Sequence, residues 1–408
     1  MKLAICIPTH NGRKSQLREL LDSIAQQQFE KGRVEICISD NASTDGSAEM
    51  VTAYAKRTDV PIHYFRFSKD MGVRNFINAI GLAKAEYCWL MGSDDAMMPG
   101  SLQAVLMALD EYENIGGCTV NKLNFDVTLS KLAGPDHEIV LPENPLQPQV
   151  FGKKGDAISE LGMTFLFMSA HVFRRDLWNE AFLRNGIDKI SSMNYFAHSF
   201  LVAQVAAGQA GWLWIPDFLV VQRLGNSSAR EELRKRELAY ALQSTNDAMA
   251  FFLEVAGQDI PSYRELLRKL YVIYWNPLQL LRYKLQQSCS FADDIKMLGY
   301  CSRSFWRIRL FWPTALPLLL MPSYLARLVG ALQAWAPRPP GKSNPARQEW
   351  GAYVTARTLI FLGVERGAKQ EIGRAVQDSR ATAYRFFETN RRRAIEEESL
   401  PHGSTLTE

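Results

Sequence analysis

The sequence predicts an α/β fold, with a mostly parallel β-sheet in the N-terminal part and an α-helical region after it. Short apolar runs alternate there with stretches of helical periodicity, which is typical of a parallel sheet covered by helices on both faces. Each apolar run leads directly into a polar segment rich in turn residues. These polar segments are therefore expected to share one edge of the sheet, at the strand carboxyl ends, where such sheets bind ligands.

The predicted strands are short and mainly apolar, and they cover Leu3–Pro8, Val34–Ser39, Ile62–Phe67 and Tyr87–Met91. The polar segments after the first three strands are Thr9–Gly12, Asp40–Ser47 and Lys69–Asn75. Between the strands, apolar residues recur every three or four positions, as in Leu17, Leu20, Leu21 and Ile24. This spacing predicts helices with one buried face.

The fourth strand leads into two adjacent carboxylates, Asp94 and Asp95, and Pro99 and Ser101 then open the next helix. Two neighbouring carboxylates at the end of a buried strand suit a hard divalent cation, which prefers oxygen ligands and often bridges to substrate phosphates. An Asp-Asp turn that merely caps the next helix is the alternative.

Four segments, in this order and spacing, resemble the motifs of the family-2 glycosyltransferases, which are inverting enzymes with the nucleotide-sugar-binding fold called GT-A. They are Ile5–Gly12, Ser39–Gly46, Gly72–Asn75 and Gly92–Asp95. Within that family, the segments Gly72–Asn75 and Tyr87–Gly92 look most similar to the abequosyltransferase-like branch, which assembles sugars of bacterial surface polysaccharides. The resemblance implies a GT-A domain over residues 1–228.

The resemblance also implies a donor site. Asp40 is expected to accept a hydrogen bond from a pyrimidine base, and it could serve uracil or cytosine, so UDP and CDP donors both stay open. An Asx-turn or helix cap is the alternative for Asp40. Pro8 and Thr9 would line the other side of the base. Arg74 would bring positive charge to the diphosphate, unless it is a solvated residue at a helix start.

By the same resemblance, Asp95 would bind the metal and Asp94 would reach the ribose or the sugar as part of the catalytic site. Mn²⁺ or Mg²⁺ on Asp95 would bridge the diphosphate and stabilise the departing nucleotide. Ser93 stands where the family usually has the first acid of an Asp-x-Asp triplet. The site therefore has one carboxylate fewer, and we expect a lower affinity for the metal.

Inversion needs a general base on the face of the sugar opposite the leaving group. The Glu-Asp pair that usually supplies it has no counterpart in this sequence. His198 lies at the expected spacing and titrates near neutrality, so it is the candidate base. The alternative is a core histidine bonded to the backbone. His171 and Asp176 are fallbacks, although Asp176 could also cap a helix.

The segment Trp212–Ser228 resembles the end of such a catalytic domain, where Arg223 and Asn226 could touch the diphosphate or the acceptor. Helical patterns dominate afterwards; they cover Glu231–Val255, Tyr263–Tyr274, Leu278–Gln287, Tyr353–Glu365 and Gln370–Asn390. We therefore expect a helical domain over residues 229–390 and a polar tail over 391–408.

This helical region is strongly basic, with thirteen Lys and Arg but only three acids between Ser262 and Arg347. Its uncharged stretch Leu310–Ala326 contains three prolines, which argue against a regular spanning helix. An interfacial or re-entrant segment fits better, with Trp306, Trp312 and Trp335 at the headgroups and arginines on anionic lipid. The alternatives are a kinked helical core and an oligomer interface. No nucleic-acid recognition motif accompanies the basic residues.

Composition sets further bounds. The six cysteines form no Cys-x-x-Cys pair, and the first apolar run is too short for a secretion signal, so we expect a cytoplasmic protein at the inner face of the membrane. The resemblance implies transfer of one sugar from a nucleoside-diphosphate donor to a glycan acceptor, such as a polyprenyl-diphosphate-linked oligosaccharide. The alternative is a degenerate, transferase-like scaffold of a polysaccharide assembly complex.

Overall fold

The computed structural model describes residues 1–130, 147–193, 196–224, 237–256, 260–275, 277–285, 290–309 and 311–327, and residues 378–389 except 380 and 384. The chain divides into two compact units. The first comprises residues 1–134, 141–226 and 365–408, and the second comprises 135–140 and 227–364. The division near residue 226 lies close to the predicted boundary. The described residues between 378 and 389, for which the sequence predicts a place in the helical domain, are grouped with the first unit.

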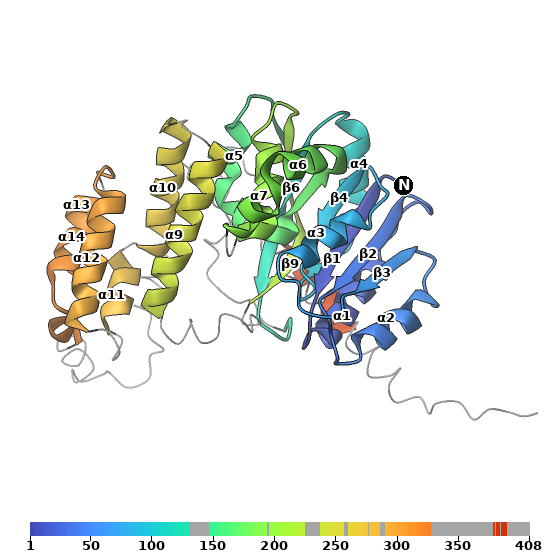
Figure 1. Cartoon of the computed structure of the whole chain (residues 1–408), viewed down its shortest axis with the longest axis horizontal. Helices are drawn as coiled ribbons and strands as arrows, with labels where there is room; N and C mark the ends of the chain where they lie inside the picture. Colours follow the sequence, from blue (N-terminus) through green and yellow to red (C-terminus); the bar gives the residue numbers. More distant parts are fainter. Residues whose placement is uncertain are drawn as a thin grey trace, which may run out of the picture. The chain divides into compact units, whose positions relative to one another are not determined.

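Among the described residues of the first unit, nine strands form one mixed sheet in the order β3-β2-β1-β4-β8-β6-β9-β5, and β7 pairs with β9 (Figure 1). The strands are β1 Leu3–Thr9, β2 Val34–Asp40, β3 Ile62–Arg66, β4 Tyr87–Leu90, β5 Ala96–Met97, β6 Gly117–Phe125, β7 Gln149–Phe151, β8 His171–Arg174 and β9 Trp212–Arg223. The four predicted strands are β1 to β4, and they are parallel to one another, as expected.

The chain order changes direction between β1 and β4. From β1 it proceeds outward to β2 and β3, then returns to place β4 on the other side of β1. Loops that follow strands on either side of such a switch point diverge and leave room for a ligand. The other half of the sheet is less regular, because β8 is antiparallel to both β4 and β6, whereas β9 is parallel to β6.

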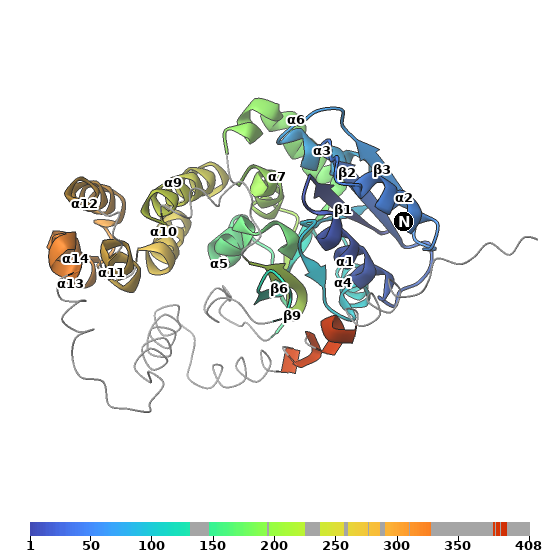
Figure 2. The same ribbon diagram turned by 90° about the horizontal axis from the view of Figure 1, so that it is seen from below.

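Helices cover both faces of the parallel half of the sheet. The described α-helices of the first unit, up to residue 226, are α1 Lys14–Ala25, α2 Ser47–Ala55, α3 Arg74–Gly81, α4 Ser101–Glu111, α5 Asp156–Leu161, α6 Arg175–Ser191 and α7 Ala197–Ala206. Figure 2 shows α3 on one side of β1 and both α1 and α4 on the other. The predicted apolar face of α1 is buried, since Leu17, Leu20, Leu21 and Ile24 are all inaccessible to solvent. The strand β3 differs from the expectation of burial on both faces, because it is a half-exposed edge strand.

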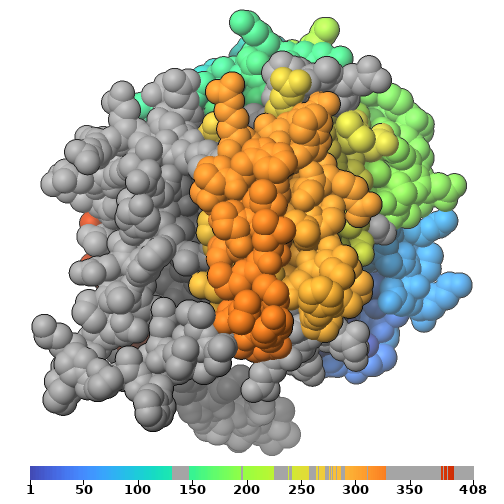
Figure 3. Space-filling view, turned by 90° about the vertical axis from the view of Figure 1, so that its left-hand side faces the viewer, coloured from blue at the N-terminus to red at the C-terminus, as the bar shows by residue number. Residues whose placement is uncertain are grey.

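The second unit is helical in its described parts, in agreement with the predicted helices between residues 237 and 285. Its helices are α9 Glu237–Ala256, α10 Ile260–Tyr274, α11 Pro277–Leu285, α12 Phe291–Phe305, α13 Phe311–Thr314 and α14 Leu316–Leu320. Its core contains Trp275, Tyr271 and Phe305. The last three helices form much of the face seen in orange in Figure 3. The predicted helix Tyr353–Glu365 and the residue Trp335 lie outside the described residues.

The proline-rich stretch 311–326 is broken into short helices and is amphipathic. Phe311, Ala315 and Leu319 are buried in the core of the second unit. On the other side, Trp312 and Leu320 are 48% and 62% exposed. In the part of the chain that the structure describes, no helix is both long enough and apolar enough to cross a bilayer. The stretch thus supplies part of a protein core while leaving large apolar side chains at the surface.

Glu35, near the start of β2, is a completely buried charged residue. Glu35 is 0% exposed, and its Oε1 accepts hydrogen bonds from the backbone N–H groups of Lys84 and Ala85 at 2.7 and 2.6 Å. Its Oε2 lies 3.1 Å from Nε2 of His63 on β3. Glu35 therefore ties β2 to the turn that leads into β4.

We expect Glu35→Ala to lower the free energy of unfolding by about 1–3 kcal/mol, because it leaves two backbone donors without their acceptor. Chemical denaturation of the full chain measures this loss. Glu111→Ala, at the exposed end of α4, is the control and should change stability little. Equal effects of the two substitutions would contradict this role of Glu35.

Candidate active site

The loops that follow β1 and β2 are joined to each other at the carboxyl edge of the sheet. The backbone N–H of Gly12 donates to Asp45 Oδ2 at 2.8 Å, and that of Thr44 donates to Asn11 Oδ1 at 2.7 Å. Asp45 also accepts from the backbone N–H of Ser47 at the start of α2. The polar segments thus share one edge, as the sequence predicted, and Asp45 connects the loop after β1 to the start of α2.

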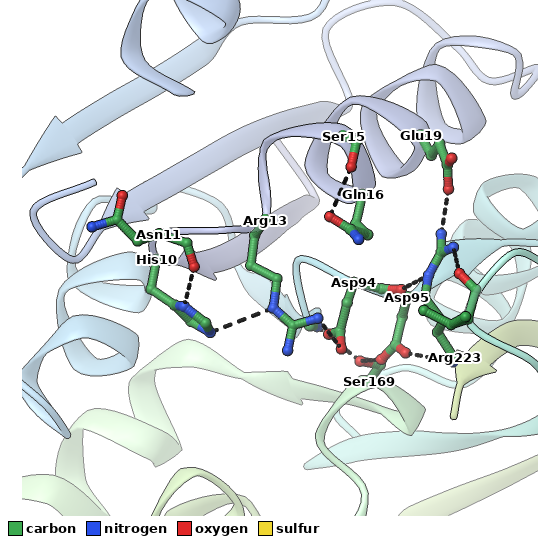
Figure 4. Close-up of polar contacts among 12 residues, drawn as sticks. His10, Asn11, Arg13, Ser15, Gln16, Glu19, Asp94, Asp95, Ser169 and Arg223 are labelled. Atoms are coloured by element: carbon green, nitrogen blue, oxygen red, sulfur yellow. Dashed lines mark hydrogen bonds and ion pairs between the residues drawn. The ribbon is translucent and has the colours of Figure 1, made fainter. Parts of the chain in front are cut away.

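The two carboxylates after β4 point to different partners (Figure 4). Asp94 Oδ2 lies 2.9 Å from Nη1 of Arg13, the residue that precedes α1, and the Asp94 side chain keeps 26% of its surface exposed. Arg13 itself is buried, and its Nε lies 3.5 Å from Nε2 of His10. This ion pair spans the switch point, because Arg13 follows β1 and Asp94 follows β4.

Asp95 is turned toward the sheet and is only 4% exposed. Its Oδ2 accepts a hydrogen bond of 2.6 Å from Ser169 Oγ, and its Oδ1 accepts one of 3.1 Å from the backbone N–H of Arg223. Ser169 Oγ in turn accepts from the backbone N–H of Gly92 at 2.8 Å. Burial, followed by the negative charge of Asp94, raises the pKa of Asp95 to about 7, although its two hydrogen bonds act in the opposite direction.

Arg223, the last residue of β9, fixes the loop that carries Asp94 and Asp95. Its Nε donates to the backbone oxygen of Asp94 at 2.7 Å, and its Nη1 donates to that of Val127 at 2.5 Å. Its Nη2 pairs with Glu19 on α1. The sequence analysis expected Arg223 to touch a diphosphate or an acceptor. In the structure Arg223 is 6% exposed, and its guanidinium binds other groups of the protein.

Two residues of this site, Arg13 and Ser169, were missed by the sequence analysis. Arg13 directly follows the first motif, Ile5–Gly12, and a cation next to a ligand-binding loop was the available signal. Ser169 lies in a 3₁₀ helix, Met168–Ala170, within a segment whose sequence suggests only titratable bases as functional residues. No local pattern distinguishes this serine from others, because its partner Asp95 is 74 residues away.

On the predicted donor side, Asp40 is 0% exposed and both of its carboxylate oxygens are engaged. Oδ1 accepts from the backbone N–H of Ser43 at 2.9 Å, and Oδ2 accepts from the hydroxyl of Tyr64 at 2.6 Å. Burial, and then this bond to Asp40, raise the pKa of Tyr64 well above its ordinary value. These are the contacts of a loop-organising aspartate, the alternative that the sequence left open.

Thr9 and its neighbours form the wall beside Asp40. Thr9 is 0% exposed, and among the described residues its Oγ1 has no hydrogen-bond partner. Asn75, at the start of α3, donates from Nδ2 to the backbone oxygen of Thr9 at 3.0 Å. Pro8 is partly exposed. Arg74 is exposed at the first position of α3, so its side chain is accessible to an anion.

The three candidates for a general base differ in their environments. His171 is 1% exposed, its Nδ1 lies 3.0 Å from Thr119 Oγ1, and its Nε2 lies 3.0 Å from the backbone oxygen of Thr164. Burial lowers the pKa of His171 to about 3, so this residue is a neutral member of the core. Asp176 accepts from the backbone N–H of Leu177 in the first turn of α6 and pairs with Arg174. Both fallbacks are thus engaged in contacts within the protein.

His198 is the second residue of α7 and is partly exposed. It lies near enough to His171 for its charge to contribute to the lowered pKa of that residue. Ser169, the partner of Asp95, lies two residues before His171, the first residue of β8. Of the two histidine candidates, His198 is the one that keeps some access to solvent.

The donor set for a metal is small. Among the described residues, no group of three or more His, Cys, Asp or Glu side chains is arranged to hold a metal ion. The available set is the pair Asp94 and Asp95, in line with the serine at position 93.

The raised pKa of Asp95 predicts a pH-dependent stability. Between its ordinary value of 3.8 and about 7, the folded state keeps a proton that the unfolded chain has released. The free energy of unfolding should therefore fall as the pH rises through this window, by up to about 1.4 kcal/mol per pH unit. Asp95→Asn should remove this contribution, whereas Asp217→Asn, on the exposed part of β9, should retain it. Denaturation at pH 5 and pH 7 without divalent cations measures it, and identical pH profiles for all three proteins would contradict the assignment.

Comparisons with known proteins agree with this geometry. Residues 4–182 match the family model described as Glycosyl transferase family 2. The chain is 35% identical over 187 residues to the abequosyltransferase RfbV of Salmonella typhimurium, covering 44% of this chain and 54% of that protein. It is 23% identical over 202 residues to the poly(ribitol-phosphate) β-N-acetylglucosaminyltransferase TarS of Staphylococcus aureus, covering 49% of this chain and 33% of TarS.

The fold has a solved counterpart. The crystal structure of TarS residues 1–349 in complex with UDP superposes with a TM-score of 0.52 at 11% identity, over 76% of this chain and 81% of that one. This likeness shows a common fold. The chain spans only about half the length of the abequosyltransferase that it matches. The family match, the motif order and the sheet topology together show that residues 4–182 of this chain form a glycosyltransferase family 2 domain with a GT-A fold.

Proposed function

We propose that this protein is an inverting glycosyltransferase that moves one sugar from a nucleoside-diphosphate donor to a glycan acceptor in the synthesis of a surface polysaccharide. The observation that carries the proposal is the carboxylate pair Asp94 and Asp95, which lies at the switch point of a family 2 domain beside the loops after β1 and β2. The similarity to an abequosyltransferase and to a poly(ribitol-phosphate) glycosyltransferase supports a polysaccharide acceptor.

In this proposal the donor nucleotide occupies the edge formed by the loops after β1 and β2. Thr9 supports this assignment, since a buried hydroxyl without a partner gains a hydrogen bond from a ligand. Pro8 and Asp40 complete the wall, and Asp40 acts chiefly by fixing the loop through Ser43 and Tyr64. A pyrimidine base, as in UDP or CDP, is the candidate; the TarS structure contains UDP. The exposed Arg74 would meet the diphosphate.

The residues described at this site fit a divalent cation, although they supply only two carboxylates. Burial, followed by the negative charge of Asp94, raises the pKa of Asp95, and a cation bound there would favour the ionised carboxylate. Its oxygens are held by Ser169 and by the N–H of Arg223, and each keeps a second lone pair. We assign Mn²⁺ or Mg²⁺ to Asp95, with the remaining ligands from the diphosphate. When bound, the ion would stabilise the negative charge of the leaving nucleoside diphosphate.

The other polar residues would orient the reactants. Asp94, held in place by Arg13, would accept hydrogen bonds from hydroxyl groups of the ribose or the sugar. His198 would take the proton of the acceptor hydroxyl as that oxygen attacks the anomeric carbon opposite the leaving group, which inverts the configuration. The neutral form of histidine is the active form of such a base.

The second unit supports an acceptor at a membrane surface. Trp306, Trp312 and Tyr324 expose 51%, 48% and 60% of their surface, and they lie close in sequence to several arginines. Exposed aromatic side chains with neighbouring cations are suited to the interface of an anionic bilayer. We therefore propose a peripheral location at the inner face of the cytoplasmic membrane and a polyprenyl-diphosphate-linked acceptor.

The first test is a panel of UDP-, CDP-, GDP- and dTDP-sugars, each added to the full chain with and without Mn²⁺ while the thermal midpoint of unfolding is recorded. One nucleotide should raise the midpoint in a metal-dependent way, because a ligand stabilises the state that binds it. Asp95→Asn should abolish the metal-dependent part and the transfer activity, whereas Asp217→Asn should retain both. A well-folded protein that responds to no nucleotide would favour the non-catalytic scaffold instead.

The assignment of the base is tested by His198→Ala. We expect kcat to fall by about 10²- to 10⁴-fold, the usual contribution of a general base, while the donor-induced shift of the midpoint stays as in the wild type. The buried His171 provides a comparison, since His171→Asn should lower stability through its lost core contacts. Full turnover of His198→Ala would remove this residue from the mechanism.

A further inference from the structure

We propose that the C-terminal segment within residues 378–389 stabilises the candidate active site. It packs on Phe125 and thereby fixes the position of Arg223, which in turn positions the carboxylate pair. For the catalytic consequence, this inference rests on the proposed function. The sequence alone gave no reason to connect this segment with the N-terminal domain, and it was assigned to the helical domain.

The segment has one buried face. Ser379, Ala383 and Phe387 are four residues apart, so they lie on one side of a helix. Ala383 is 0% exposed and Phe387 is 7% exposed, whereas Arg385 and Glu388 face solvent. The Phe387 ring meets the ring of Phe125 edge to face, with centroids 6.1 Å apart and an interplanar angle of 65°. Figure 2 shows the segment in red near the end of β9.

Phe125 is the point at which this contact reaches the sheet. It is the last residue of β6, it is 0% exposed, and its partner in the adjacent strand is Arg223. Its backbone oxygen accepts a hydrogen bond of 2.8 Å from the N–H of Leu224, the residue after Arg223. The aromatic contact with Phe387 therefore restrains the end of the β6–β9 pair, at the position where Arg223 ends β9.

Arg223 transmits this restraint to the carboxylates. Its backbone N–H binds Asp95, and its Nε binds the backbone oxygen of Asp94. If the end of β9 loosens, both contacts lose their fixed geometry together, although no residue of the donor site has been removed. Catalytic groups that shift by about 1 Å can lose as much as a hundredfold in rate. The C-terminal segment would thus affect turnover more than donor binding.

The test compares full-length Phe387→Ala and Phe387→Leu with the control Arg385→Ala, which changes the exposed face of the same segment. Hydrogen exchange should accelerate in Phe387→Ala at the amides of Arg223 and Leu224, but not across β1 and β2. Its kcat should fall about tenfold to a hundredfold, with the donor KM changed by less than about threefold, while Phe387→Leu keeps most of the rate. The loss should also be less than additive with Arg223→Lys, since both act through one contact.

Each outcome decides the question. Unchanged exchange at Arg223 and Leu224 in Phe387→Ala would overturn the proposal, as would faster exchange with unchanged kcat. Faster exchange throughout the first unit would indicate a role in general stability and would also overturn it. If Phe387→Ala does not fold, the same measurements on Phe387→Leu decide, with smaller effects of the same pattern. A wild-type protein without transfer activity would refute the proposed function, whereas the exchange experiment would still test the contact.

Discussion

The buried carboxylate of Asp95 is the group on which the rest of the site depends. A charge at the edge of a sheet that is removed from water needs fixed hydrogen-bond donors, and Asp95 receives them from Ser169 and from the backbone of Arg223. These donors come from the elements around β8 and β9. The parallel half of the sheet therefore supplies the carboxylate, but only the irregular half makes its burial possible.

The two neighbouring carboxylates are given different properties by their surroundings. Asp94 keeps contact with solvent and is paired with Arg13, whereas Asp95 is buried next to a like charge, which raises its pKa. Such a division suits a site in which one carboxylate contacts a sugar and the other carries a cation. Arg223 fixes both, since it binds the backbone of one residue and the side chain of the other.

The two units of the chain differ in how their apolar and polar side chains are arranged. The first uses buried strands and a few internal polar contacts, such as that of Glu35 with the turn at Lys84, to present rigid loops at one edge. The second combines a core around Trp275 with large apolar side chains left at its surface, such as Leu320. The prolines between residues 313 and 322 account for this arrangement, because they divide the apolar stretch into short helices that expose one side.

The four parallel strands, the shared edge of their polar loops and the family 2 motifs could be predicted from the sequence, because alternating apolar runs and turn motifs are local features. The sequence also located Asp94 and Asp95. Tertiary structure decided what surrounds them: Ser169 and Arg223 lie 74 and 128 residues from Asp95, and no periodicity records such contacts. It likewise buries His171 in the core, which lowers its pKa, and groups the described residues between 378 and 389 with the first unit. Burial and long-range hydrogen bonds arise only when distant segments pack together, and they fix the chemistry of the residues that the motifs identify.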